Sequence, residues 1–367
     1  MDKPAEKKIL FAIAHQYHRA SLDPIYECMK ASGNYDIYFS CTEEKRGRWR
    51  FFQKSLRGEI EAGLRAEGLK TTAETRGFDA VVTGDILRDA RPYGGALLCF
   101  VNHGTGIKTI LYRLLAKHKD TPYAIFVEGE YRKRKIEEFG VQGASQIYVV
   151  GYPKLDPVFQ GKLDRTAIME RWNLDPAKKT VLFAPTYKPT CLDAVRERIL
   201  TETTGHNLLI KLHHYSWRGR YAPHWHHTIY EKVLRDFPHA RLIPPEEHNI
   251  LPFIYVADTM ISEASSTIFE FLALGKLGII FDLDCDRLRH SDGMPILNED
   301  NRHFLEGAFI HIGGPDEIRP AVERALDPSD KMKADVAGYR DRLFYKLDGR
   351  ASERIVATMD RLLKERT

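Results

Sequence analysis

The stretch VNHGTGIKT, residues 101–109, places a histidine, two glycines and a lysine between an apolar run and a pattern typical of a helix. It is not a nucleotide-triphosphate loop, because that loop requires Gly-Lys-Ser/Thr and Ile107 separates Gly106 from Lys108. His103 therefore stands at the expected carboxyl end of a strand, where glycines allow the backbone to approach a ligand closely. Two interpretations remain open, a catalytic histidine and a tight turn with an ordinary polar residue.

A second polar segment holds Glu263, Ser265, Ser266 and Thr267, which follow a predicted strand and precede a predicted helix. Hydroxyl and backbone N–H groups at the start of a helix can bind a phosphate, aided by about half a positive charge from the helix dipole. The alternative is that Ser265 or Ser266 caps the helix, an interaction typically worth ~1 kcal/mol. The pattern predicts either a phosphate site or a capped helix.

Two further predicted strands end in basic or hydroxyl side chains. NLLIKLHH ends in Lys211, His213 and His214, and strand alternation predicts that Lys211 and His213 share a face on which both could contact one anion. VLFAPTYK places Thr186 and Lys188 at the corresponding end of another strand. These positions are candidates for contacts with an anionic ligand.

Three nearby histidines, His224, His226 and His227, raise the question of a zinc site. No carboxylate or cysteine accompanies them at a usual ligand spacing, so an exposed aromatic loop is preferred and no metal ligand is predicted. The stretches 45–58 and 130–140 interleave basic and aromatic residues. They indicate charged helix faces or, as a second interpretation, contact with an anionic membrane surface.

The charge balance of the chain limits the class of partner. Its 367 residues include 55 basic and 51 acidic side chains, and a formal net charge of +4 does not indicate a nucleic-acid-binding protein.

Five cysteines without Cys-x-x-Cys spacing indicate reduced thiols and a cytoplasmic location. No run approaches the roughly 20 apolar residues that cross a bilayer, so any membrane contact is expected to be peripheral.

Short apolar runs alternate with helical patterns along the chain, which predicts an α/β architecture of parallel sheets covered by helices on both faces. The first series is KILFAIA, YDIYFS, FDAVVTG, ALLCFVNHG, YAIFVEGE and QIYVVGYP, and the second is KTVLFAPTY, NLLIKLHH, ARLIPP, TMISEAS, LGIIFDLD and AFIHIGG. We expect two doubly wound Rossmann-like domains, over residues 1–160 and 161–340, that face each other across a cleft. The helix in residues 341–367 is expected to pack back on the first domain.

Six motifs, in order, resemble those of the CDP-glycerol glycerophosphotransferase family, the polymerases and primases of teichoic-acid-like polymers. They are HGTGIKT (103–109), GYPKLD (151–156), FAPTYK (183–188), IKLHH (210–214), ISEASSTIFEFLALGKLGIIF (261–281) and LDGRASERI (347–355). The resemblance implies a GT-B glycosyltransferase fold, with the nucleotide held mainly by the second domain and the acceptor by the first.

The resemblance also implies roles for individual residues. His103 becomes the general base, which suits an imidazole near neutral pH, and His213 becomes a catalytic contact to the donor pyrophosphate. Donor-side positions comprise Thr186, Lys188, Lys211, Glu263, Ser265, Ser266 and Thr267. Acceptor-side positions comprise Gly104, Thr105 and Lys108. Fixed donors on these residues could stabilise the departing phosphate, so no metal or cofactor is expected.

The implied reaction moves glycerol phosphate, or a related polyol phosphate, from CDP-glycerol or another CDP-polyol to a hydroxyl group of a lipid-linked or polymer acceptor. It would serve the synthesis of a cell-surface polymer or glycolipid, in the cytoplasm or at the inner face of the membrane. The sequence has Glu263 and Ala264 where the family has Asp and Tyr, which leaves the donor open. A GT-B glycosyltransferase or epimerase acting on a nucleotide sugar is the alternative, and a non-catalytic polyanion-binding protein is the third.

Overall fold

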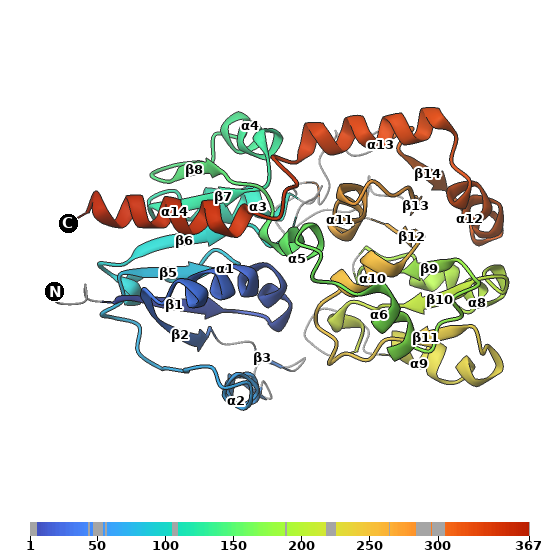
Figure 1. Cartoon of the computed structure of the whole chain (residues 1–367), viewed down its shortest axis with the longest axis horizontal. Helices are drawn as coiled ribbons and strands as arrows, with labels where there is room; N and C mark the ends of the chain where they lie inside the picture. Colours follow the sequence, from blue (N-terminus) through green and yellow to red (C-terminus); the bar gives the residue numbers. More distant parts are fainter. Residues whose placement is uncertain are drawn as a thin grey trace. The chain divides into compact units, whose positions relative to one another are not determined.

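The structure is a computed structural model that describes residues 6–42, 45–46, 54–55, 57–104, 109–187, 189–217, 225–263, 265–283, 295 and 305–366. Over this part of the chain, two six-stranded parallel sheets with flanking helices form the framework (Figure 1). Each sheet strand lies within one of the apolar runs found in the sequence or extends beyond it by one residue. The predicted α/β fold with two doubly wound sheets is therefore confirmed.

The chain divides into two compact units. The first comprises Met1–His103, Leu111–Lys162 and Leu343–Thr367, and the second comprises Gly104–Ile110 and Leu163–Arg342. The boundary at Lys162 lies within the stretch of prolines and charges that the sequence places between its two series of apolar runs. Each unit contains one six-stranded sheet.

The first sheet has the strand order β2-β1-β5-β6-β7-β8. Its strands are β1 (Lys7–Ile13), β2 (Tyr35–Cys41), β5 (Ala80–Thr83), β6 (Leu97–Val101), β7 (Tyr123–Val127) and β8 (Gln146–Val149). A short antiparallel pair, β3 (Lys45–Arg46) and β4 (Lys54–Ser55), stands apart from it. Because the strands are parallel, their carboxyl ends meet at one edge. The order brings β1 beside β5, with Ala12 paired to Thr83.

Helices cover both faces of the first sheet, as the alternation along β1 requires. Ile9 and Phe11 belong to one buried cluster, whereas Leu10 and Ala12 belong to a second, because successive side chains of a strand point to opposite faces. The helices of this part of the chain are α1 (Arg19–Ser32), α2 (Arg57–Ala66), α3 (Ile110–Lys117), α4 (Glu130–Glu138), α5 (Asp156–Phe159) and α14 (Ala351–Lys364).

The C-terminal helix α14 packs on the first sheet, where Ile355 and Met359 are buried. The carboxylate of Asp156 accepts hydrogen bonds from the N–H groups of Ala351 (3.0 Å) and Ser352 (2.7 Å). The first N–H groups of a helix have no partner within it, and a negative charge there is favourable. Two of the motifs, GYPKLD and LDGRASERI, therefore meet to fix the start of α14.

The second sheet has the strand order β11-β10-β9-β12-β13-β14. Its strands are β9 (Thr180–Phe183), β10 (Asn207–Ile210), β11 (Ala240–Leu242), β12 (Thr259–Ser262), β13 (Gly278–Phe281) and β14 (Phe309–Ile312). The surrounding helices are α6 (Arg165–Arg171), α7 (Leu192–Val195), α8 (Arg198–Glu202), α9 (His226–Glu231), α10 (Leu251–Val256), α11 (Thr267–Ala273), α12 (Ile318–Leu326) and α13 (Asp330–Leu343). No helix among the described residues combines the length and apolar character that crossing a membrane requires.

Candidate active site

His103 lies two residues beyond β6, at the carboxyl edge of the first sheet. Its Nδ1 contacts the carbonyl oxygen of Gly84, and because a carbonyl only accepts, Nδ1 must carry the proton. In a neutral ring, Nε2 then holds the lone pair. The Tyr152 hydroxyl donates to the His103 carbonyl (2.7 Å), so both the ring and the backbone are positioned.

Burial lowers the pKa of His103, because the charged ring is separated from water. The negative charge of Asp85 and the Gly84 carbonyl oppose this shift, whereas His15 and Lys154 add to it. The imidazole is therefore neutral at pH 7 in the unliganded protein, and Nε2 can accept a proton.

A buried polar network supports the end of β6 next to His103. Asn102 donates to Glu128 (3.0 Å), and Arg132 donates to the other oxygen of Glu128 (2.9 Å) and to the Tyr112 hydroxyl (2.7 Å). Arg132 is only 3% exposed, so it is not part of the charged surface that the sequence predicted for residues 130–140. The helical pattern of that stretch did not reveal this inward-pointing arginine, because its neighbours are also charged.

The predicted acceptor-side residues are only partly described. Gly104 lies in the second unit, where a Cβ atom at this position would be 3.6 Å from the Cβ of Ser266. Thr105 and Lys108 lie outside the described residues. Further along, the Thr109 hydroxyl donates to the Pro295 carbonyl (2.6 Å).

Lys211 follows β10 at the carboxyl edge of the second sheet and is 8% exposed. Among the described residues, no oxygen hydrogen-bonds to its ammonium group and no carboxylate pairs with it. Burial lowers the pKa of Lys211 to about 8, although Glu247 and Glu246 oppose the shift. An unpaired buried ammonium group is costly, and an anionic ligand would relieve that cost.

Lys276 provides a control for this interpretation, since burial also lowers its pKa to about 8. Its ammonium group donates to the carbonyl oxygens of Ile254 (3.1 Å), Tyr255 (2.6 Å) and Ala257 (2.7 Å), which end α10. Lys276 thus has a structural role in capping a helix. Lys211, which is more deeply buried than Lys276, has no such partner in the described part of the chain.

His213 is the N-cap residue of the short helix His214–Ser216. Its Nδ1 accepts a hydrogen bond from the Tyr215 N–H (3.2 Å). In the neutral ring, Nε2 therefore carries the proton and can donate to an anion. β10 ends at Ile210, so strand alternation does not extend to Lys211 and His213. That the two side chains contact one anion stays a prediction.

Glu263 and Thr186 are held by contacts within the second unit. The Glu263 carboxylate accepts from the N–H groups of Thr186 (2.8 Å) and Cys191 (3.3 Å), and the Thr186 hydroxyl donates to the Pro189 carbonyl. These contacts fix the loop after β9 against the end of β12. Donor contacts by either residue stay predictions, and Lys188 lies outside the described residues.

The start of α11 shows one of the two alternatives drawn from the sequence, a capping contact. Ser265 Oγ accepts from the N–H (3.3 Å) and from the hydroxyl (2.9 Å) of Thr267, which is a capping interaction. Ser266 occupies the N-cap position itself without a side-chain capping hydrogen bond. Capping is therefore present at Ser265, and phosphate binding by this segment stays a prediction.

The histidine-rich segment does not form a three-ligand site in the described part of the chain. His226 is fully buried with its Nε2 3.5 Å from Asp193, and His227 Nδ1 lies 3.2 Å from the Ser216 carbonyl oxygen. His224 lies outside the described residues. A different group, His15, His18 and Asp85, does come together beside His103, and the spacing His-x-x-His after the first apolar run was the signal that could have pointed to it.

Two doubly wound parallel sheets with polar side chains at the carboxyl ends of their strands agree with the GT-B fold that the resemblance implies. The chain belongs to the CDP-glycerol:poly(glycerophosphate) glycerophosphotransferase family, whose model matches residues 100–360.

Individual proteins are similar to this chain in sequence or in fold. The teichoic acid poly(ribitol-phosphate) polymerase of Bacillus spizizenii is 24% identical over 253 residues, which are 65% of this chain but only 37% of the relative. A structure of the wall teichoic acid polymerase TagF aligns with a TM-score of 0.68 at 16% identity, covering 98% of this chain and 89% of that one. UDP-GlcNAc 2-epimerase from Neisseria meningitidis aligns with a TM-score of 0.62 at 13% identity, covering 96% and 100%.

Proposed function

We propose that the protein transfers glycerol phosphate, or a related polyol phosphate, from a CDP-activated donor to a hydroxyl group of an acceptor. The acceptor is a lipid-linked molecule or a growing polymer, and the product contributes to a cell-surface polymer or glycolipid. Membership of the family supports this reaction class. The geometric observation that carries the proposal is the buried Lys211 ammonium group, which has no acceptor among the described residues.

Lys211 is proposed to bind the donor pyrophosphate. A buried ammonium group interacts strongly with a phosphate, because the low local dielectric strengthens the attraction and the anion replaces lost hydration. His213 lies two residues beyond Lys211 along the chain, and its Nε2 can donate a second hydrogen bond. Such donors, positioned before the reaction, stabilise the charge that develops on the leaving phosphate.

His103 is proposed to act as the general base. The acceptor oxygen attacks the phosphorus that carries glycerol, the bond from that phosphorus to the CMP oxygen breaks, and CMP leaves with the electron pair. His103 Nε2 takes the proton of the acceptor hydroxyl, since Nδ1 is committed to the Gly84 carbonyl. General-base catalysis of this kind contributes about 10² to 10⁴ in rate.

A second candidate is a GT-B enzyme that acts on a nucleotide sugar. The alignment with the UDP-GlcNAc 2-epimerase of Neisseria meningitidis, which covers the whole of that protein, favours it. In this case the donor would be a UDP- or CMP-sugar, and a transferase would attack the anomeric carbon. Both candidates use an anion site in the second unit, so donor identity separates them.

The test is a thermal-shift series with CDP-glycerol, CDP-ribitol, a UDP-sugar and a CMP-sugar, followed by an assay of CMP release with acceptor. At a concentration of about 100 times its Kd, the cognate donor adds about 2.7 kcal/mol to the free energy of unfolding. The rise in melting temperature should therefore be large. We expect a CDP-polyol to stabilise Lys211→Met much less than it stabilises the wild type. A shift with UDP-sugars alone would reject the proposal in favour of the second candidate.

A further inference from the structure

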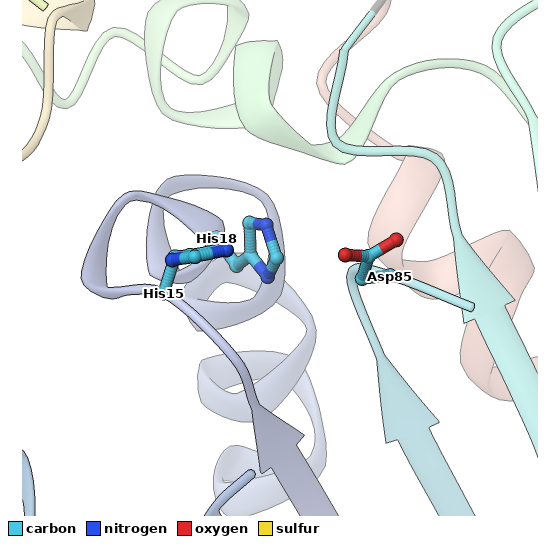
Figure 2. A group of neighbouring side chains, drawn as sticks. All are labelled: His15, His18 and Asp85. Atoms are coloured by element: carbon cyan, nitrogen blue, oxygen red, sulfur yellow. The ribbon is translucent and has the colours of Figure 1, made fainter. Parts of the chain in front are cut away.

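His15, His18 and Asp85 form a compact group at the carboxyl edge of the first sheet (Figure 2). His15 and His18 follow β1, Asp85 follows β5, and these two strands are paired. One ligand atom from each residue lies within 4.8 Å of those of the other two. His18 is fully buried, while His15 and Asp85 are half-buried. Residues far apart in sequence thus bring two imidazoles and a carboxylate together.

The surroundings orient this group. Asp85 Oδ1 accepts a hydrogen bond from the Ile86 N–H (2.9 Å), which fixes the direction of the carboxylate. At Gly84, an added Cβ would lie 3.0 Å from the Cβ and Cγ atoms of His18, so the ring packs directly on the backbone. Outer contacts that orient a carboxylate or an imidazole are typical of metal sites.

We propose that His15, His18 and Asp85 bind one divalent first-row transition-metal ion, with zinc as the ion to test first. Imidazole nitrogens suit zinc, iron, copper and nickel, whereas magnesium and calcium prefer oxygen ligands throughout. Two imidazoles and one carboxylate also form the three-ligand set of zinc sites that keep a further position open. Ligand atoms around tetrahedral zinc lie about 3.3 Å apart, so the three side chains draw together on binding.

The proposed ion would join the segments after β1 and β5, both of which contact His103. The His18 ring centroid lies 4.1 Å from that of His103, and the Gly84 carbonyl, next to Asp85, accepts from His103 Nδ1. The ion would thereby hold the surroundings of His103 in place. The inference does not depend on the proposed transferase reaction, since its test measures binding of the metal.

The experiment uses the tag-free full chain, treated with EDTA, freed of chelator, equilibrated with Zn(II) and desalted. Metal is measured by mass spectrometry, and Co(II) titration with visible absorption reports the coordination geometry and affinity. We expect about one zinc per chain, a raised melting temperature and intense d–d bands typical of four- or five-coordinate cobalt. A wild-type protein that retains no zinc overturns the proposal.

Asp85→Asn is the principal variant, because it keeps the shape of a side chain whose removal could disturb the fold. The matched control is Asp282→Asn, which alters a carboxylate 2.9 Å from Nδ1 of His311 in the second unit. Loss of an outer contact alone costs about 10- to 100-fold in metal affinity, so loss of a ligand should weaken binding by at least that much. Equal zinc affinity in the two variants would assign the metal to other histidines and overturn the proposal.

Discussion

At the carboxyl edge of the first sheet the polar groups near His103 include two imidazoles and a carboxylate. At that of the second sheet they include a buried lysine, hydroxyl groups and an imidazole. His103 is held with Nδ1 protonated, so Nε2 accepts. His213 is held in the opposite sense, because its Nδ1 accepts from a backbone N–H and Nε2 donates. The same residue type thus presents an acceptor nitrogen in one unit and a donor N–H in the other, in keeping with the roles proposed for His103 and His213.

Two lysines of the second unit, the buried Lys211 and the half-buried Lys276, refine this comparison. Both Lys211 and Lys276 have a pKa lowered to about 8 by burial, yet only Lys276 is satisfied by carbonyl oxygens. Burial alone therefore does not distinguish a binding lysine from a structural one. The partners within the fold make that distinction, and the predictions below test it together with the role of His103.

The largest effect is expected for His103→Ala. Loss of the general base should lower kcat by about 10² to 10⁴ while the Kd for the CDP-donor stays unchanged, because the base acts in the transition state. Steady-state assays of CMP release and calorimetric donor titration measure the two quantities. His311→Ala, which removes a half-buried histidine of the second unit, should keep both at the wild-type level. Turnover near the wild type in His103→Ala would remove this residue from the mechanism.

Lys211→Met and Lys276→Met should have opposite signatures. Loss of a charged hydrogen bond to phosphate should weaken donor binding in Lys211→Met by about 1.5–3 kcal/mol, or roughly 10- to 150-fold. Removal of an unpaired buried charge should also raise its melting temperature. Lys276→Met should instead leave three carbonyl oxygens without a donor and lower the free energy of unfolding by about 1–3 kcal/mol.

Titration calorimetry measures the donor Kd of each variant, and thermal melts measure its stability. If Lys211→Met binds the CDP-donor as tightly as the wild type and melts lower, Lys211 is a structural residue. If Lys276→Met alone loses donor binding, the two lysines have been assigned the wrong way round.

Donor affinity should depend on pH through Lys211. The anion favours the protonated lysine, so affinity is full well below the pKa of about 8 and falls by up to about tenfold per pH unit above it. Lys211→Arg should remove this dependence, because arginine stays protonated. Donor Kd measured between pH 6.5 and 9.5 tests both statements. A pH profile that is flat in the wild type, or equally steep in Lys211→Arg, would contradict the assignment.

The free energy of unfolding of the unliganded protein should rise with pH over the range in which donor affinity falls. A lysine whose pKa is lower in the folded state binds its proton more weakly there than in the unfolded chain. The free energy of unfolding should therefore rise from about pH 8 towards the ordinary lysine value of 10.5. Chemical denaturation across this range measures it, and Lys211→Met should reduce the slope.

The smallest effect is expected for Ser265→Ala. Loss of the hydrogen bond from the Thr267 N–H should lower the free energy of unfolding by about 0.5–2 kcal/mol, as for other capping residues. Urea denaturation measures this change, and donor titration on the same variant shows whether the hydroxyl also binds phosphate. A variant of wild-type stability with weakened donor binding would make Ser265 a ligand contact rather than a cap.

The amino-acid sequence by itself determined the strands and the class of fold. Buried parallel strands need short, nearly continuous apolar runs, and every strand of the two sheets lies in such a run or extends beyond it by one residue. It also located His103 and Lys211 at strand ends, because each directly follows such a run. These are local properties, and local patterns suffice to predict them.

Only the tertiary structure decided what those strand ends contact. Strand order places β9 beside β12, which brings Glu263 to the N–H of Thr186, and places β1 beside β5, which brings His15 and His18 to Asp85. Such neighbours are far apart in sequence, and the apolar pattern of a strand carries no information about which strand lies beside it. Lys211 differs from Lys276, and the buried Arg132 differs from a surface arginine, in the partners that the fold supplies to each side chain.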